Sequence, residues 1–134
     1  MSIGAPHLTA LGHSYGSTTT GMAAARVRPG VVDDLVLFGS PGAGARDARD
    51  FNVPDGHAWV SGVGWWGDAV QGLGGENFGV NPMRMAGITH LSNEAPDERD
   101  WWEFMTNPFA RHSIYLEPGS GTLEDFGKVV VGAK

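Results

Sequence analysis

Short apolar runs separated by helix-like segments dominate the pattern along the chain. Residues 6–12, 35–38 and 57–61 are largely apolar and are closed by glycine or by turn-forming residues. Uninterrupted apolar runs of this length are typical of strands that are buried on both faces of a parallel sheet. Residues 84–91 form a fourth candidate strand, which Gly87 weakens. The pattern therefore predicts about four strands.

Helical patterns lie between and after these runs. Residues 17–27 begin with Ser and Thr, continue through Met-Ala-Ala-Ala and stop before Pro-Gly, so they predict a helix. Residues 96–104 predict a second helix, with acidic residues in its first turn. Residues 122–131 carry apolar side chains on one face and predict a closing amphipathic helix. Residues 42–57 are expected to be irregular or weakly helical, and residues 67–82 are expected to form a glycine-rich loop.

Strands that alternate with helices at this spacing predict the α/β class, with about four mostly parallel strands flanked by helices. The chain has 134 residues, and 41% of them are hydrophobic, which suits one domain with a real core over residues 1–134. We find no internal repeat and no domain boundary in the pattern.

Charge and composition exclude several classes of partner. There are 15 acidic against 9 basic residues, a formal charge of −6, so we expect no nucleic-acid partner and no anionic membrane surface. No apolar run approaches the roughly 20 residues of a membrane span, and the first residues do not form a signal peptide, so a cytoplasmic location is the default expectation. The absence of cysteine removes disulfides, thiolate metal sites and a cysteine nucleophile.

The chemistry is concentrated in Gly12-His13-Ser14-Tyr15-Gly16. This is a G-x-S-x-G motif placed between a predicted strand and a predicted helix, where a sharp, strained turn exposes a nucleophilic serine. We expect glycines on both sides because side chains there would collide with the neighbouring strand and helix. The backbone N–H of Tyr15, at the start of the helix, would supply one donor of an oxyanion hole.

A second glycine motif carries no such weight. Residues 62–67 match G-x-G-x-x-G after a strand. A glycine-rich loop follows instead of a helix, so there would be no helix N-terminus to receive a pyrophosphate. We therefore expect no dinucleotide cofactor, and no other cofactor or metal.

Hydrolases with this serine turn place an acid and then a histidine after the serine along the chain. Asp68 follows the strand at 57–61 by a few residues and is the favoured acid, which would orient the histidine and stabilise its charged form. Asp47 and Asp50, which follow the preceding strand, remain alternatives.

Two histidines follow Asp68. His112 lies in a predicted loop after the last strand and is the favoured general base, whereas His90 falls within a predicted strand, where a side chain is more often packed than catalytic. His13 precedes the serine, and its side chain would point elsewhere. His7 and His57 are expected to be structural or exposed.

These motifs together resemble an actinobacterial α/β-hydrolase family of unknown function. The likeness rests on GHSYGS at 12–17, VDDLVLFGSPG at 32–42, Asp68 in GDAV and RHSIYLEPGS at 111–120. It extends over nearly the whole chain, and the two longer motifs are specific. The resemblance implies a serine hydrolase in which Ser14, Asp68 and His112 form the catalytic triad.

The chain departs from the family pattern in three places. Arg111 replaces the usual glycine before the histidine, and residues 92–110 look like an insertion. A complete α/β-hydrolase also carries four strands before the strand that precedes the serine, together with the loop that donates the second oxyanion N–H. The resemblance therefore covers the C-terminal half of the fold. The serine strand would form an exposed apolar sheet edge, which a homo-oligomer could cover.

The sequence predicts a serine hydrolase that acts on a small-molecule carboxylic ester or acyl substrate through an acyl-enzyme intermediate, without a cofactor. The alternative is a catalytically inactive truncated hydrolase fragment or assembly module that keeps the motifs by descent. Loss of one oxyanion donor costs about 100–1,000-fold in turnover, so the absence of the loop that supplies it leaves both hypotheses open.

Overall fold

The structure is a computed structural model, and it describes residues 4–62, 75–92 and 115–134. Within these residues four parallel strands form one sheet in the spatial order β1-β2-β3-β4. The strands are β1 (Thr9–His13), β2 (Asp34–Phe38), β3 (Ala58–Ser61) and β4 (Thr89–His90). The predicted α/β class with four parallel strands and flanking helices is confirmed.

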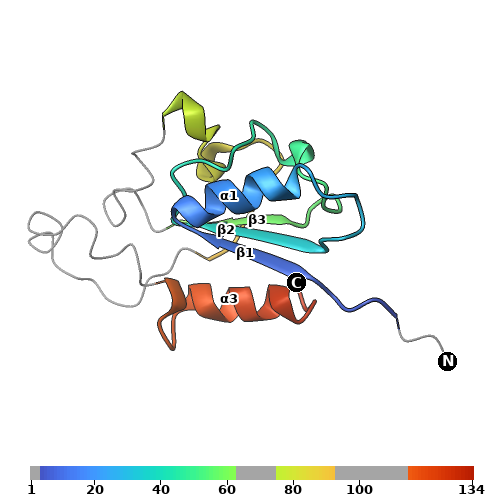
Figure 1. The fold of residues 1–134 in the computed structure, drawn as a ribbon. Helices are drawn as coiled ribbons and strands as arrows, with labels where there is room; N and C mark the ends of the chain where they lie inside the picture. Colours follow the sequence, from blue (N-terminus) through green and yellow to red (C-terminus); the bar gives the residue numbers. More distant parts are fainter. Residues whose placement is uncertain (1–3, 63–74, 93–114) are drawn as a thin grey trace, which may run out of the picture.

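In the described part of the chain two α-helices lie on opposite faces of the sheet, α1 (Tyr15–Ala24) on one and α3 (Gly121–Val130) on the other (Figure 1). All five residues of β2 are buried, as expected for a strand covered on both faces. Its side chains alternate between two apolar clusters. Leu35 and Leu37 pack in one cluster with residues from α1 and the loops beside it, while Val36 and Phe38 pack in the other with residues from α3.

Small residues bring α1 close to the chain that follows β2. A Cβ atom on Gly21 would lie 2.1 Å from the carbonyl oxygen of Ala43, so only glycine fits at this position of the helix. The Thr18 hydroxyl donates to the carbonyl of Gly42, which joins the same helix to the same loop. The start of α1 is therefore fixed against the carboxyl end of β2.

Short 3₁₀ helices occupy the connections: η1 (Ala48–Asp50), η3 (Glu76–Phe78) and η4 (Pro82–Arg84). The predicted strand over 84–91 is wrong for most of its length, since only residues 89–90 form β4. Asn81 caps η4 by accepting from the Met83 N–H, Pro82 favours a helical start, and Gly87 has a φ of 75°. These features turn the chain before β4 can begin.

The other elements lie close to where the pattern predicts them. The helix expected over 17–27 begins at Tyr15 and ends at Ala24, and the closing helix expected over 122–131 is α3. The helix expected over 96–104 lies outside the described residues. No helix in the described part of the chain is long and apolar enough to cross a membrane.

Candidate active site

Ser14 occupies a strained turn between β1 and α1. Its φ is 58° and its ψ is −133°, and it is the only non-glycine residue with positive φ among the described residues. Such a backbone conformation is costly for a side-chain-bearing residue and persists only where its surroundings enforce it. Here the Ser14 N–H donates to the Phe38 carbonyl at 3.0 Å, and the Ser17 N–H donates to the Ser14 carbonyl at 3.0 Å.

The Ser14 hydroxyl takes no part in capping the helix. A serine at the N-cap ordinarily accepts a hydrogen bond from a backbone N–H in the first turn. Ser14 is the N-cap of α1, yet its side chain makes no cap hydrogen bond. Its side chain is half-buried. The turn therefore presents a hydroxyl that is not used to stabilise the helix, as a nucleophile requires.

The two motif glycines behave differently. A Cβ atom on Gly12 would lie 2.7 Å from the Cα of Ser17 and 2.9 Å from the Thr20 side chain, so the expected collision is confirmed there. A Cβ atom on Gly16 would meet nothing within 4 Å among the described residues. The expectation of a steric requirement at Gly16 is therefore not supported by this part of the chain. Gly16 is exposed in the first turn of α1.

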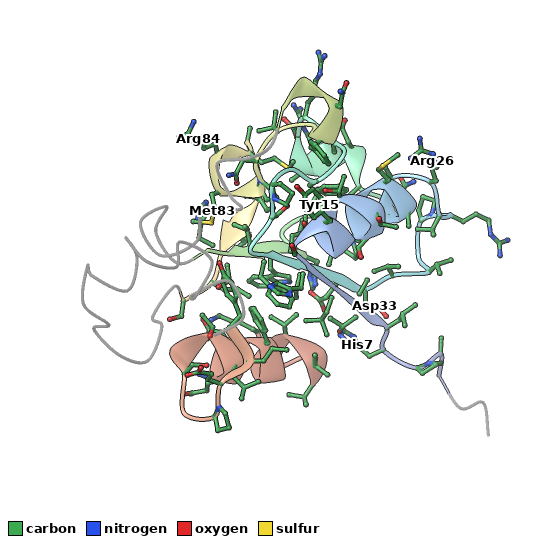
Figure 2. The ribbon with its side chains drawn as sticks, turned by 60° about the vertical axis from the view of Figure 1, so that its left-hand side comes forward. His7, Tyr15, Arg26, Asp33, Met83 and Arg84 are labelled. Carbon is green, nitrogen blue, oxygen red and sulfur yellow. The ribbon has the colours of Figure 1, made fainter. Side chains whose placement is uncertain are left out.

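Tyr15 is the first residue of α1, where backbone N–H groups have no partner within the helix. No described residue accepts a hydrogen bond from its N–H. The side chain is 53% exposed, and its ring lies 5.5 Å from the ring of Phe78. Figure 2 shows Tyr15 at the start of the helix, with His7 and Asp33 near the opposite end of β1. The position suits an N–H donor to a developing oxyanion.

His13 packs into the apolar cluster beneath α3 and is not placed as a base. Its ring stacks on Phe38 with centroids 4.9 Å apart and 15° between the planes. It also meets the edge of Tyr115 at 5.8 Å. Tyr115 is 1% exposed, and its carbonyl accepts a hydrogen bond from the Thr122 hydroxyl at 2.7 Å. The aromatic contacts thus fix one neighbour of Ser14 to the chain that follows residue 114.

The alternative acids are used locally. Asp47 and Asp50 form a capping box on η1, and the hydrogen bond from the Arg49 side chain lowers the pKa of Asp47 to about 2. The next residues bind the far end of α1, where the Asn52 N–H donates to the carbonyl of Ala24 at 2.9 Å. Ten helical residues separate Ser14 from that end, a distance of about 15 Å. Both carboxylates are thus engaged in hydrogen bonds within residues 46–50.

Asp68 and His112 both lie outside the described residues. Described residues a few positions before Asp68 and a few positions after His112 are held by hydrogen bonds and ring contacts. β3 ends at Ser61, whose hydroxyl donates to the Ser92 carbonyl at 2.8 Å, and Tyr115 is held as described above. The alternative base His90 is an exposed residue of β4.

Two buried hydroxyls below the serine turn, those of Ser17 and Ser40, are not predicted by the pattern of the sequence. The oxygens of Ser17 and Ser40 lie 2.5 Å apart, and Ser17 Oγ lies 2.5 Å from the Ser14 carbonyl oxygen. Both serines belong to the quoted motifs, Ser17 as the last residue of GHSYGS and Ser40 as the serine of GSPG. This membership is the one feature of the sequence that marks them.

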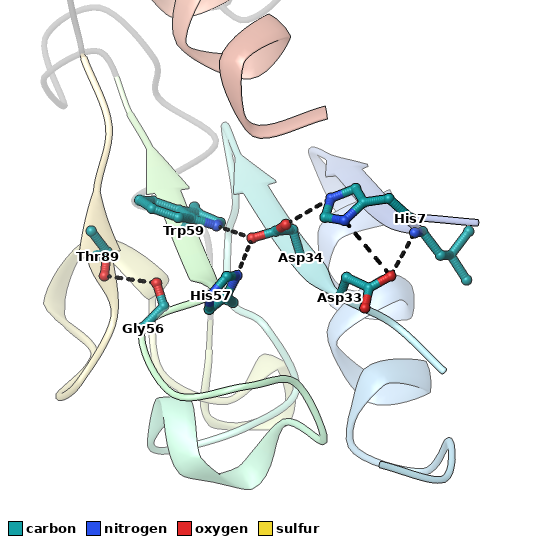
Figure 3. Close-up of polar contacts among 8 residues, drawn as sticks. His7, Asp33, Asp34, Gly56, His57, Trp59 and Thr89 are labelled. Carbon is teal, nitrogen blue, oxygen red and sulfur yellow. Dashed lines mark hydrogen bonds and ion pairs between the residues drawn. The ribbon is translucent and has the colours of Figure 1, made fainter. Parts of the chain in front are cut away.

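A second polar cluster lies at the opposite end of the strands (Figure 3). The carboxylate of Asp34 is 2% exposed and accepts from Trp59 Nε1 at 2.7 Å and from His57 Nδ1 at 2.8 Å. His7 Nε2 lies 2.9 Å from its other oxygen. The expectation that His7 and His57 are structural or exposed agrees with these contacts. Among the described residues no group of three or more acidic or histidine side chains is arranged to hold a metal ion.

Comparison with known proteins places these features in a family. An uncharacterized protein of Mycobacterium bovis and one of Mycobacterium tuberculosis are each 40% identical to this chain over 88 residues, which are 64% of this chain and 32% of the relative. The chain thus spans about a third of the length of these curated relatives. No solved structure matches it. A family model described as alpha/beta hydrolase matches residues 2–72, which include the strained serine turn and the first three strands. The chain therefore belongs to the alpha/beta hydrolase family.

Proposed function

We propose that this chain is the catalytic portion of a serine hydrolase that acts on carboxylic esters. The observation that carries the proposal is the geometry of Ser14, which lies between a parallel strand and a helix N-terminus. Its backbone is strained, and its hydroxyl makes no helix-capping hydrogen bond. In this proposal His112 is the general base and Asp68 orients it. The Tyr15 N–H is the oxyanion donor that the chain supplies.

The reaction runs through an acyl-enzyme. The Ser14 oxygen attacks the acyl carbonyl while His112 accepts the hydroxyl proton, and the resulting oxyanion accepts a hydrogen bond from the Tyr15 N–H. The tetrahedral intermediate collapses, and the alcohol leaves with the proton from His112. Water then attacks the acyl-serine by the same steps and releases the carboxylic acid.

The topology supports the assignment of acid and base. In a parallel sheet the carboxyl ends of all strands meet at one edge, and Ser14 directly follows β1 at that edge. Asp68 follows β3, the second neighbour of β1 in the sheet. His112 precedes Tyr115 by three residues, a chain length of about 11 Å at most, and Tyr115 contacts the neighbour of Ser14. The described residues that flank the two segments, Ser61 before Asp68 and Tyr115 after His112, thus lie toward the same end of the sheet as Ser14.

A fluorophosphonate probe tests the proposal, because it reacts with serines activated for acyl transfer. The purified chain is treated with the probe, and its intact mass is compared with that of a Ser14→Ala variant, with circular dichroism on both. We expect one adduct on the native chain and none on the variant. A folded native chain that gains no adduct would overturn the proposal and favour the inactive fragment or assembly module.

Substrate class is tested on the same two proteins. We expect the native chain to release nitrophenol from short acyl nitrophenyl esters faster than the Ser14→Ala variant does. The matching nitroanilides, which carry an amide in place of the ester, should react more slowly. Equal rates with both linkages would contradict the assignment to esters.

A further inference from the structure

A chain of buried hydrogen bonds connects the loop after β2 to the backbone of Ser14. The Ser17 oxygen lies 2.5 Å from the Ser14 carbonyl oxygen and 2.5 Å from the Ser40 oxygen. The Gly42 N–H donates to Ser40 Oγ at 3.2 Å. Ser17 is 0% exposed and Ser40 is 3% exposed, so water does not compete for these groups. The two serines are 23 residues apart in the sequence.

The number of hydroxyl hydrogens determines which group donates in each of these hydrogen bonds. A serine hydroxyl has one hydrogen, and a carbonyl oxygen can only accept. Ser17 must therefore donate to the Ser14 carbonyl, since otherwise two oxygens would face each other at 2.5 Å without a hydrogen between them. The Ser40 hydroxyl then donates to Ser17 Oγ, and Ser40 Oγ accepts from the Gly42 N–H. Each hydroxyl donates once and accepts once, an arrangement in which each bond strengthens the next.

The last hydrogen bond of this network, from Ser17 to the Ser14 carbonyl, sets the direction of the Tyr15 N–H. The carbonyl of Ser14 and the N–H of Tyr15 belong to one planar peptide unit, and the described residues contain no cis peptide bond. In a trans peptide the C=O and N–H point in opposite directions, so a group that holds the carbonyl also holds the N–H. The Ser14 carbonyl is held by two donors of Ser17, its N–H and its hydroxyl. The Tyr15 N–H is thereby directed out of the helix N-terminus.

We propose that Ser17 and Ser40 are positioning residues that aim the Tyr15 N–H at the oxyanion. This inference rests on the proposed function, because it assigns them to the same serine site. Neither side chain touches the substrate. They act through the Ser14–Tyr15 peptide. The Ser14 backbone is strained, with a φ of 58°, so this peptide would tend to rotate if hydrogen bonds did not hold it. A preorganised donor is worth more than a mobile one because it needs no reorientation as charge develops.

Three single variants of the 134-residue chain test this role. Ser17→Ala and Ser40→Ala each break the chain of hydroxyls. Thr18→Val is the matched control: Thr18 is buried on the same helix, and its hydroxyl donates to the Gly42 carbonyl and not to Ser14, Ser17 or Ser40. A double variant, Ser17→Ala with Ser40→Ala, tests whether Ser40 acts through Ser17.

The first measurement is independent of catalysis. We expect the Tyr15 amide signal in ¹H–¹⁵N NMR spectra to shift, and its hydrogen exchange to accelerate, in both serine variants and not in Thr18→Val. The second measurement is the rate of fluorophosphonate labelling of Ser14. We expect about a tenfold loss in Ser17→Ala, a smaller loss in Ser40→Ala, and less than a twofold change in Thr18→Val. The double variant should label at the rate of Ser17→Ala alone, because neighbours in one network are not additive.

The possible outcomes separate the two proposals. A wild-type chain that folds but is not labelled overturns the proposed function, while the Tyr15 amide still decides whether the serines position that peptide. An unchanged Tyr15 amide in both serine variants, or losses that add in the double variant, would overturn the positioning role. Should Ser17→Ala give a spectrum of an unfolded chain, Ser40→Ala against Ser40→Thr decides, since threonine keeps the hydroxyl and should restore the amide position and labelling.

Discussion

Gly12 and Ser17 approach each other so closely that a Cβ atom on Gly12 would lie 2.7 Å from the Ser17 Cα. This contact packs the end of β1 against the first turn of α1, on either side of Ser14. It leaves no room for a methyl group without a backbone shift. The same contact brings Ser17 to the Ser14 carbonyl, so the spacing at Gly12 and the hydrogen bonds of Ser17 depend on each other.

Gly12→Ala should therefore destabilise the fold, and Gly16→Ala should not. Overpacking against backbone typically costs about 1–3 kcal/mol, and we expect a loss of that size at Gly12. Gly16 lies in α1 with open space around it among the described residues, and alanine there favours the helix by about 0.5–1 kcal/mol. Urea denaturation followed by circular dichroism measures both. Equal losses in the two variants would contradict the prediction.

Much of the fold follows from local patterns. The apolar run at 35–38 predicts β2 because a strand covered on both faces is mostly apolar, and the structure buries this run together with Asp34 at the start of β2. The G-x-S-x-G letters predict the strained Ser14 because the turn is a local backbone feature. The apolar pattern over 84–91 does not locate β4, because Asn81 and Pro82 start a 3₁₀ turn that this pattern does not reveal.

The buried polar contacts could not be predicted in the same way. Asp33 and Asp34 are adjacent acids before an apolar run, and nothing in the sequence distinguishes them. Only the strand register places Asp34 inside the sheet, beside Trp59 on the neighbouring strand, and leaves Asp33 half-buried. The meeting of Ser17 with Ser40 likewise depends on how α1 packs over the loop after β2. Contacts of this kind require the tertiary structure.

Asp34→Asn should destabilise the chain although its shape is conserved. The carboxylate accepts from three donors, the Trp59 indole and the rings of His57 and His7. An asparagine offers one acceptor oxygen and places an NH₂ group against an N–H donor. We expect a loss of about 1–3 kcal/mol, the usual cost of a buried polar group left unsatisfied.

Thermal and urea denaturation of Asp34→Asn provide the measurement. Asp55→Asn is the control, since Asp55 is an exposed turn residue with the same change in charge. We expect the control to remain within about 0.5 kcal/mol of the native chain. An Asp34→Asn variant as stable as the control would show that the three contacts contribute nothing to folding.

The stability contributed by Asp125 should disappear in acid. Burial raises the pKa of this carboxyl. The hydrogen bonds from Lys134 and from the Ser92 N–H, together with nearby lysine charge, lower the pKa by more, so the pKa lies below its usual value. A depressed folded pKa stabilises the fold at pH values above the unfolded pKa of about 3.9. That stability is lost as the pH falls through the folded pKa.

Asp125→Asn should therefore be less stable than the native chain at pH 7, by about 1–2 kcal/mol. The difference should shrink as the pH falls below about 4. Urea midpoints at a series of pH values from 7 down to 2.5 measure this. Glu124→Gln is the control, because Glu124 carries an exposed side chain on the same helix turn. A difference from the native chain that persists unchanged at the lowest pH would contradict the linkage.

β1 is expected to promote self-association because it lies at the edge of the described sheet. The Leu8 carbonyl accepts from the Asp34 N–H, and the Ser14 N–H donates to the Phe38 carbonyl, so even-numbered residues face β2. The backbone groups of Thr9 and Leu11 then point away from β2, because the direction alternates along a strand. Leu11 is also 45% exposed. β1 contains no lysine or proline that would discourage pairing.

Leu11→Lys should therefore shift the chain toward the monomer. A lysine on an edge strand opposes pairing with another chain, and a half-exposed position tolerates it without loss of the core. Sedimentation velocity over a range of concentrations measures the change. Val131→Lys is the matched control, since Val131 is 73% exposed but follows α3 and is not on the sheet edge. If both variants dissociate equally, exposed apolar area and not the open strand would drive association; a native chain that is monomeric at every concentration would remove β1 as a self-association surface.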